Sequence, residues 1–228
     1  YLHTEGERRF IRQLFGRYVN DKVIDAIMLL PRDDVLKGHR QHVCVLFIDI
    51  RGFTTYSESR PPNQIVDFLN RYFESLTEII MRHNGVVDKF LGDGLMAFFN
   101  APIPRPSFLE DAVAAVLEIR ETLAARKIRT TDDAFDLKVG MALHTGDAVI
   151  GNIGSERKME FTAIGDTVNT TSRLESLNKD YGTDIIVSDS VVIGTNKTYE
   201  WKFLADHQIR GKERPVPIYT LVGKKLYG

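Results

Sequence analysis

Residues 43–50 read VCVLFIDI, an apolar run that only Asp49 interrupts. A run this short and this rich in Val and Ile predicts a strand that is buried on both faces. Further along, Pro61-Pro62 opens a segment in which apolar residues recur at helical spacing as far as Gly85. The sequence therefore begins its core with a buried strand followed by an amphipathic helix.

The sequence then continues to alternate strands and helices. Gly92-Asp93-Gly94 predicts a hairpin turn, and Ser107 with Glu110 has the spacing of a capping box at a helix start. Asp166 is expected to cap a later helix that runs to about residue 178. The predicted strands after the first helix lie at 86–91, 95–99, 137–143, 148–153, 159–164, 185–187, 200–209 and 216–222. This order predicts an α+β fold, with a ferredoxin-like β-α-β-β-α-β core, extra strands and helices packed on one face of a mixed sheet.

The length of 228 residues favours one or two domains. Apolar residues recur at helical spacing over about residues 10–27, and Pro31 ends the pattern. A charged stretch follows, which indicates a linker. We therefore expect a helical N-terminal segment at 1–40 and a main domain at 41–228.

Composition excludes several classes of protein. Hydrophobic residues make up 43% and charged residues 27%, as in a globular protein with a real core. No run of about 18 apolar residues is present, and a net charge of −1 gives no support for nucleic-acid binding. The single cysteine, Cys44, and the lack of a signal peptide predict a cytoplasmic location. The start at Tyr1 suggests a piece of a longer protein, which could be membrane-anchored.

Two aspartates carry the most informative chemistry. Asp49 ends the buried run, where a carboxylate is costly unless it is paired, bound to a cation or used as a helix cap. Asp93 lies at a turn tip, where Asp-Gly also occurs for purely conformational reasons. If the first two strands of the unit lie side by side, both carboxylates face one edge and could hold two divalent metals. Oxygen ligands favour Mg²⁺ or Mn²⁺.

Other polar residues are less specific when each is taken alone. Gly52 allows a turn whose exposed amides would suit a phosphate. Asn169 and Arg173 are four apart and share a helix face, where an arginine could bind a phosphoryl group or simply be solvated. Lys89 lies in a strand, where lysines usually face solvent. The sequence contains no P-loop, no zinc-ligand pattern and no G-x-S-x-G motif.

Four stretches together resemble the catalytic domain of class III adenylyl/guanylyl cyclases, over about residues 43–222. They read VLFIDIRGFTTYSE, VVDKFLGDGLMAFFNAP, LHTGDAVIGNIG and FTAIGDTVNTTSRLESLN. The resemblance implies conversion of a nucleoside triphosphate to the 3′,5′-cyclic monophosphate and pyrophosphate. It also implies that Asp49, Asp93 and the Ile50 carbonyl bind two Mg²⁺ or Mn²⁺ ions.

The same resemblance implies roles for the remaining site residues. The amides of Gly52, Phe53 and Thr54 would cradle the phosphates. Arg173 would stabilise the transition state and Asn169 would orient the ribose. The purine-selecting pair corresponds to Lys89 and Thr162, which favours ATP over GTP and resembles the Asp-to-Thr bacterial subgroup.

One position departs from the family pattern. Where the family often has a lysine for the terminal phosphates, this sequence has Arg210, with Lys212 nearby, and either could serve.

The family builds its site across a dimer interface. Because one chain carries both halves, the resemblance implies a homodimer with two shared sites, and it makes residues 1–40 a transducing segment after a missing sensor domain.

Three competing hypotheses remain open at this point. The chain could prefer GTP, against which Lys89 argues. It could be a silent cyclase-like module, although the two aspartates, Asn169 and Arg173 are all present. It could also be another two-metal nucleotidyl cyclase, although the Gly-Gly-Asp-Glu-Phe motif of such enzymes is absent.

Overall fold

The computed structural model describes residues 38–125, 136–155 and 157–225. The predicted helix at about 10–27 and nearly all of the 1–40 segment lie outside these residues. The described elements are, in chain order, β1 (His39–Ile50), α4 (Phe53–Glu58), α5 (Pro62–Arg82), β2 (Val86–Leu91), β3 (Gly94–Phe99), α6 (Phe108–Ala124), β4 (Val139–Ser155), β5 (Lys158–Ile164), α7 (Asp166–Tyr181), β6 (Ile185–Ser188), α8 (Asp189–Thr195), β7 (Tyr199–His207) and β8 (Val216–Lys224). None of the described helices combines the length and apolar character needed to cross a membrane.

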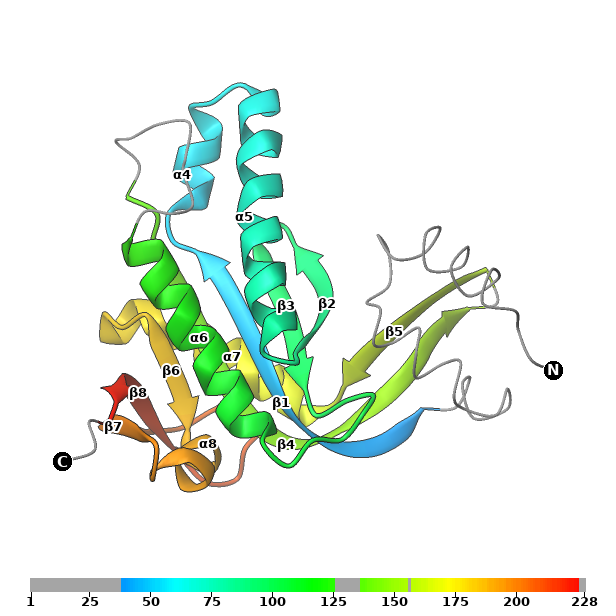
Figure 1. Cartoon of the computed structure of the whole chain (residues 1–228), viewed down its shortest axis with the longest axis vertical. Helices are drawn as coiled ribbons and strands as arrows, with labels where there is room; N and C mark the ends of the chain where they lie inside the picture. Colours follow the sequence, from blue (N-terminus) through cyan, green and yellow to red (C-terminus); the bar gives the residue numbers. More distant parts are fainter. Residues whose placement is uncertain (1–37, 126–135, 156, 226–228) are drawn as a thin grey trace.

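The strands form one mixed sheet in the order β2-β3-β1-β4-β6-β8-β7, with β5 paired to the outer half of β4. The pairs are antiparallel except for β4 and β6, which are parallel. The segment β4-β1-β3-β2 has the order of a ferredoxin-like unit, which confirms the predicted α+β class. The expectation that the first two strands are neighbours was wrong, because β3 lies between β1 and β2 (Figure 1).

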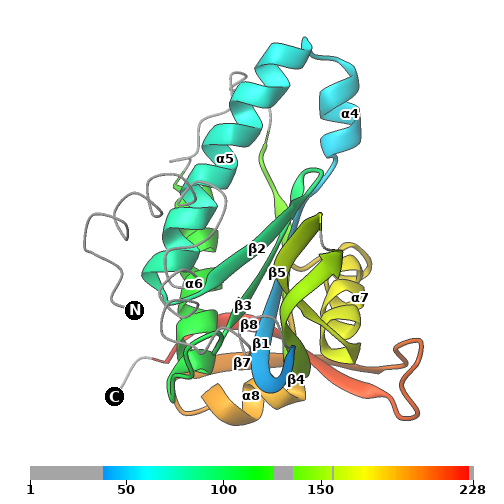
Figure 2. The same ribbon diagram turned by 90° about the vertical axis from the view of Figure 1, so that its right-hand side faces the viewer.

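Helices cover both faces of the sheet, so the expectation of a single covered face was also wrong (Figure 2). Side chains alternate along each strand. On β4, Met141 and Leu143 point into the main core, which α5 and α6 cover. Ala142 points the opposite way and packs with Leu174 of α7. The sheet is therefore buried on both faces in its centre, as the unbroken apolar run of β1 predicts.

β4 is a single strand of 17 residues where the sequence predicts two. The expected break fell near Gly146-Asp147, which resemble turn residues. Gly146 stays in the strand, and a Cβ there would lie 2.7 Å from Oγ1 of Thr167 on α7. A helix packs too closely at this position for a side chain, so the glycine serves packing and makes no turn.

The helix ends differ from expectation in detail. Ser107 caps α6, but its hydroxyl contacts Asp111 at 3.3 Å and forms no capping box with Glu110. Gly165 is the cap of α7, and Asp166 is its first residue. Two short helices, α4 and α8, were not predicted, because six and seven residues are too few for a clear apolar period.

Candidate active site

The structure brings the two predicted metal-binding aspartates together at the end of β1. Asp49 is the penultimate residue of β1, and Asp93 lies in the turn between β2 and β3. The Ile50 amide lies within hydrogen-bonding reach of both carboxylates. Gly94 makes room for this pair, since a Cβ there would lie 3.0 Å from Oδ1 of Asp49. The topology therefore positions both carboxylates at one sheet edge, with β3 as the bridge.

The surroundings of this pair raise the pKa of both carboxyl groups. Partial removal from water raises the pKa of Asp49, and the nearby charge of Asp93 raises it further, while the Ile50 amide lowers it. Burial likewise raises the pKa of Asp93, against the lowering effect of its own amide and that of Ile50. Two carboxylates that disfavour each other's ionisation suit a site that receives a cation.

A third carboxyl group, which the sequence analysis missed, lies near this pair. Burial and the charges of Asp49 and Asp93 raise the pKa of Glu175 to about 7, against the lowering effect of Arg51. Thr171, Leu174 and Asn178 form the buried stripe of α7. Glu175 falls on that stripe at helical spacing, and a charged residue there was the available signal. Within the described residues no group of three His, Cys, Asp or Glu side chains is arranged for metal binding, so Glu175 is a neighbour of the pair and completes no metal cluster.

The predicted phosphate-binding amides lie directly after β1. Gly52 is the N-cap of α4, with φ 71° in the left-handed region that favours glycine, and Phe53 and Thr54 begin the helix. The first N–H groups of a helix have no carbonyl partner within it. The amides of Gly52, Phe53 and Thr54 therefore lie at the start of α4, a few residues after Asp49 in the sequence.

Asn169 and Arg173 lie on an exposed side of α7. The guanidinium of Arg173 donates to the carbonyl of Arg210, and Lys212 pairs with Asp166 at the start of the same helix. Arg210 and Lys212 therefore both belong to the loop that adjoins the N-terminal half of α7.

The predicted purine-reading pair comes together from β2 and β5. Thr162 donates from its hydroxyl to Oδ2 of Asp88 at 2.6 Å, and Lys89 lies beside the same Asp88. Lys89 also donates to Glu160 at 2.9 Å. The sequence analysis named Lys89 and Thr162 but missed Asp88, which links them.

Sequence comparison adds a named relative. Adenylate cyclase 1 of Rhizobium meliloti (strain 1021) is 33% identical to this chain over 215 residues, which are 89% of this chain and 32% of that protein. A relative from Mycobacterium bovis without an assigned function is 34% identical over 218 residues, 95% of this chain and 37% of that protein. The chain thus spans about a third of the length of these curated relatives.

Structure comparison finds both kinds of nucleotide cyclase. The crystal structure of the guanylyl cyclase Cya2 has a TM-score of 0.74 and 31% identity, covering 83% of this chain and 96% of that one. The adenylyl cyclase CyaB from P. aeruginosa has a TM-score of 0.69, the same identity, and coverage of 83% and 98%. Residues 35–223 match the family described as the adenylate and guanylate cyclase catalytic domain, and the chain belongs to that family.

Proposed function

We propose that this chain is an adenylate cyclase domain, which converts ATP to 3′,5′-cyclic AMP and pyrophosphate. The observation that carries the proposal is the pair of Asp49 and Asp93, in which burial and the charge of Asp93 raise the pKa of Asp49, next to the first amides of α4. In a member of the cyclase family, such a pair suits metal-assisted attack of the ribose 3′-oxygen on the α-phosphorus.

Asp49, Asp93 and the Ile50 carbonyl would hold two Mg²⁺ or Mn²⁺ ions. The donor set fits these cations, because all three ligands are oxygens and no cationic side chain of the described residues lowers the pKa of either carboxyl group. Bound ions would lower the pKa of the 3′-hydroxyl and neutralise charge on the triphosphate.

The cationic and amide groups have separate parts in this proposal. The amides of Gly52, Phe53 and Thr54 would bind phosphate oxygens, as the free N–H groups of a helix start do. Arg173 would donate to the α-phosphoryl oxygens as charge develops there, with Asn169 orienting the ribose. Arg210 or Lys212 would bind the terminal phosphates.

Base selection would rest on Lys89 and Thr162. Adenine presents an acceptor at N1 and a donor at its 6-amino group. The Lys89 ammonium can donate to the first, and the Thr162 oxygen can accept from the second. Guanine presents a donor at N1 and an acceptor at O6, which is the reverse pattern, so ATP is the favoured substrate.

The active site would be shared between two copies of the chain. Arg173 and Glu175 are two residues apart on α7, which turns them about 200° from each other. Glu175 faces the aspartate pair of its own chain, whereas Arg173 faces the Arg210 carbonyl. One chain therefore directs its arginine away from its own aspartates, and a second copy would supply the arginine that they need.

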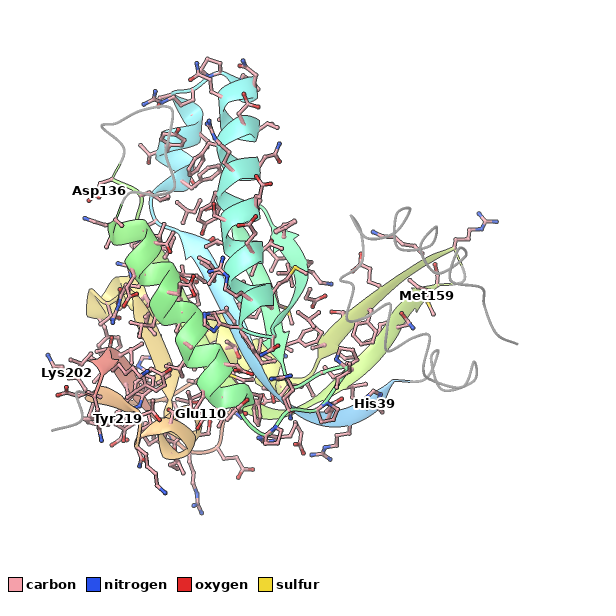
Figure 3. The ribbon with its side chains drawn as sticks, in the orientation of Figure 1. His39, Glu110, Asp136, Met159, Lys202 and Tyr219 are labelled. Atoms are coloured by element: carbon pink, nitrogen blue, oxygen red, sulfur yellow. The ribbon has the colours of Figure 1, made fainter. Side chains whose placement is uncertain are left out.

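Several exposed apolar side chains on β2, β4 and β5 would be available to such a dimer. Five large apolar side chains there are at least 39% exposed: Phe90, Leu91, Val149, Met159 and Ile164. Figure 3 shows Met159 near the tip of the two-stranded arm that β4 and β5 form. Val149 and Ile164 are cross-strand partners on β4 and β5, and exposed apolar neighbours of this kind would be available for contacts with a second chain. A head-to-tail dimer would have two equivalent sites, with residues 1–40 relaying a signal from a preceding sensor domain.

Product analysis tests the proposal. Purified protein is incubated with ATP or GTP and Mg²⁺ or Mn²⁺, over a range of protein concentrations, and cyclic products are separated. We expect cyclic AMP, with a specific activity that rises with protein concentration because the site needs two chains. Cyclic GMP as the main product would overturn the base assignment, and no cyclic product at high concentration with Mn²⁺ would overturn the activity.

A further inference from the structure

Asp88 occupies an irregular position in β2. The register with β3 pairs Val87 with Ala97 and Lys89 with Met96, so Asp88 is an extra residue in a β-bulge. Consecutive side chains of a regular strand point to opposite faces. Here Asp88 and Lys89 both reach β5, where they contact Thr162 and Glu160. The bulge thus turns two adjacent side chains toward the same neighbouring strand.

The Asp88 carboxyl group is deeply buried and only partly satisfied. Its side chain is 1% exposed. Oδ2 accepts from Thr162, but Oδ1 has no hydrogen-bond partner among the described residues. Burial raises the pKa of Asp88, and the charge of Glu160 adds to this, while the Thr162 hydroxyl, the nearby Lys89 and the Ala163 amide lower it. Lys89 Nζ is 4.0 Å from Oδ1, which is close enough for attraction but too far for a hydrogen bond.

An ionised carboxylate fixes the direction of the Thr162 hydroxyl. A hydroxyl has one hydrogen and two lone pairs, so it can ordinarily either donate or accept. A carboxylate can only accept, so the single hydrogen of Thr162 is committed to Asp88. What remains on the Thr162 oxygen is an acceptor, which pairs with a donor on a bound base and repels a second acceptor.

We propose that Asp88 is a positioning residue that sets base specificity by holding the Thr162 hydroxyl in its accepting orientation. The inference rests on the proposed function, in which Thr162 reads the 6-position of the purine. Adenine offers an amino donor there and guanine a carbonyl acceptor. Without Asp88 the hydroxyl could rotate and donate to guanine, so threonine alone would discriminate poorly between the two.

A purely stabilising role accounts less well for these contacts. A buried carboxylate is costly to desolvate, and an apolar residue of similar size is often at least as stable. The unpartnered Oδ1 adds to that cost. A residue that sets the hydrogen bonding of its neighbour explains why a carboxylate is present at all.

The test measures binding of 3′-deoxy-ATP and 3′-deoxy-GTP, which lack the attacking hydroxyl, by calorimetry in the presence of Mg²⁺. Asp88→Asn keeps the shape but can both donate and accept. We expect this variant to lower the ratio of the Kd for 3′-deoxy-GTP to the Kd for 3′-deoxy-ATP at least about tenfold. Asp206→Asn is the matched control. Asp206 lies at an exposed position on β7, at the opposite end of the sheet from β2, so Asp206→Asn makes the same chemical change away from the base-reading residues and should keep the ratio within about twofold.

A second background separates positioning from general damage. In Thr162→Val there is no hydroxyl to orient, so adding Asp88→Asn should leave that background's Kd ratio within about twofold. If Asp88→Asn lowers the Kd ratio equally in wild type and in the second background, or lowers it in neither, the proposal is overturned. If Thr162→Val leaves the ratio unchanged, the base-reading assignment itself fails. Selective binding without cyclic AMP formation would refute the proposed activity alone.

Discussion

The carboxyl group of Glu175 occupies the space that a side chain on Gly140 would need. Gly140 pairs with Asp49 across β4 and β1. The missing side chain therefore lets α7 place the Glu175 carboxyl group close to Asp49, where burial and the charge of Asp49 raise the pKa of Glu175. Gly140 thus allows a side chain of α7, on one face of the sheet, to lie close to the candidate metal site.

Gly140→Ala should destabilise the protein by about 1–3 kcal/mol, because the new methyl group must displace Glu175 in a packed region. Urea unfolding followed by circular dichroism measures the change. Gly223→Ala on β8 is the control, since nothing lies within 4 Å of a Cβ there. Equal effects of the two substitutions would show that Glu175 moves aside without cost.

Glu175→Gln should change how stability depends on pH in metal-free protein. The folded pKa of about 7 lies above the unfolded value of 4.5. The folded state therefore holds a proton that the unfolded state has lost, and stability falls as pH rises between these values. Glutamine does not titrate, so the variant does not lose this stability as pH rises. It should be more stable than wild type at pH 8 by on the order of 1 kcal/mol, since partial exposure screens the charge.

Urea unfolding at pH 5 and pH 8 with a chelator measures this difference. Glu121→Gln removes one carboxyl group from an exposed position on α6 and controls for the change in net charge. A difference between wild type and Glu175→Gln that stays constant with pH would contradict the raised pKa.

The strongly patterned parts of the fold were predictable from the sequence. The apolar run of β1 and the Gly92-Asp93-Gly94 turn gave a strand and a hairpin, because burial and turn chemistry act locally. The face on which α7 packs was not predictable. It depends on which residues of β4 point toward it, and Gly146 resembles a turn residue until Thr167 is seen above it.

The residues of the candidate site were likewise only partly predictable from the sequence. Asp49 could be named because an acid in an apolar run is unusual, and Asp93 because the turn places it near Asp49. Lys89 and Thr162 could be named because they match a family pattern. Asp88 could not, because alternation along a regular strand would point it away from Thr162. Only the bulge in β2 brings the two together, and a one-residue register shift leaves no clear mark in a single sequence.

Asp49→Asn and Asp93→Asn should each lower cyclase activity at least about 100-fold, because each removes a charged metal ligand. The same substitutions should leave metal-free stability unchanged or raised, because the two carboxylates disfavour each other's ionisation. Cyclic AMP formation and the thermal unfolding midpoint are measured together. Asp67→Asn, at an exposed position on α5, is the control for loss of a carboxylate. Activity retained in either site variant would remove that aspartate from the metal site.

Mixing two inactive variants tests whether the site is shared. Asp49→Asn and Arg173→Ala should each be inactive alone, because each homodimer has the same defect in both sites. A mixed dimer has one doubly defective site and one intact site, so an equal mixture should recover about a quarter of wild-type activity when subunits exchange freely. Asp49→Asn mixed with Asp93→Asn is the matched control. Both defects lie in the metal-binding half, so every site keeps one of them and no recovery is expected. Recovery in the control, or none in the test mixture once exchange is verified by differently tagged subunits, would contradict a site built from two chains.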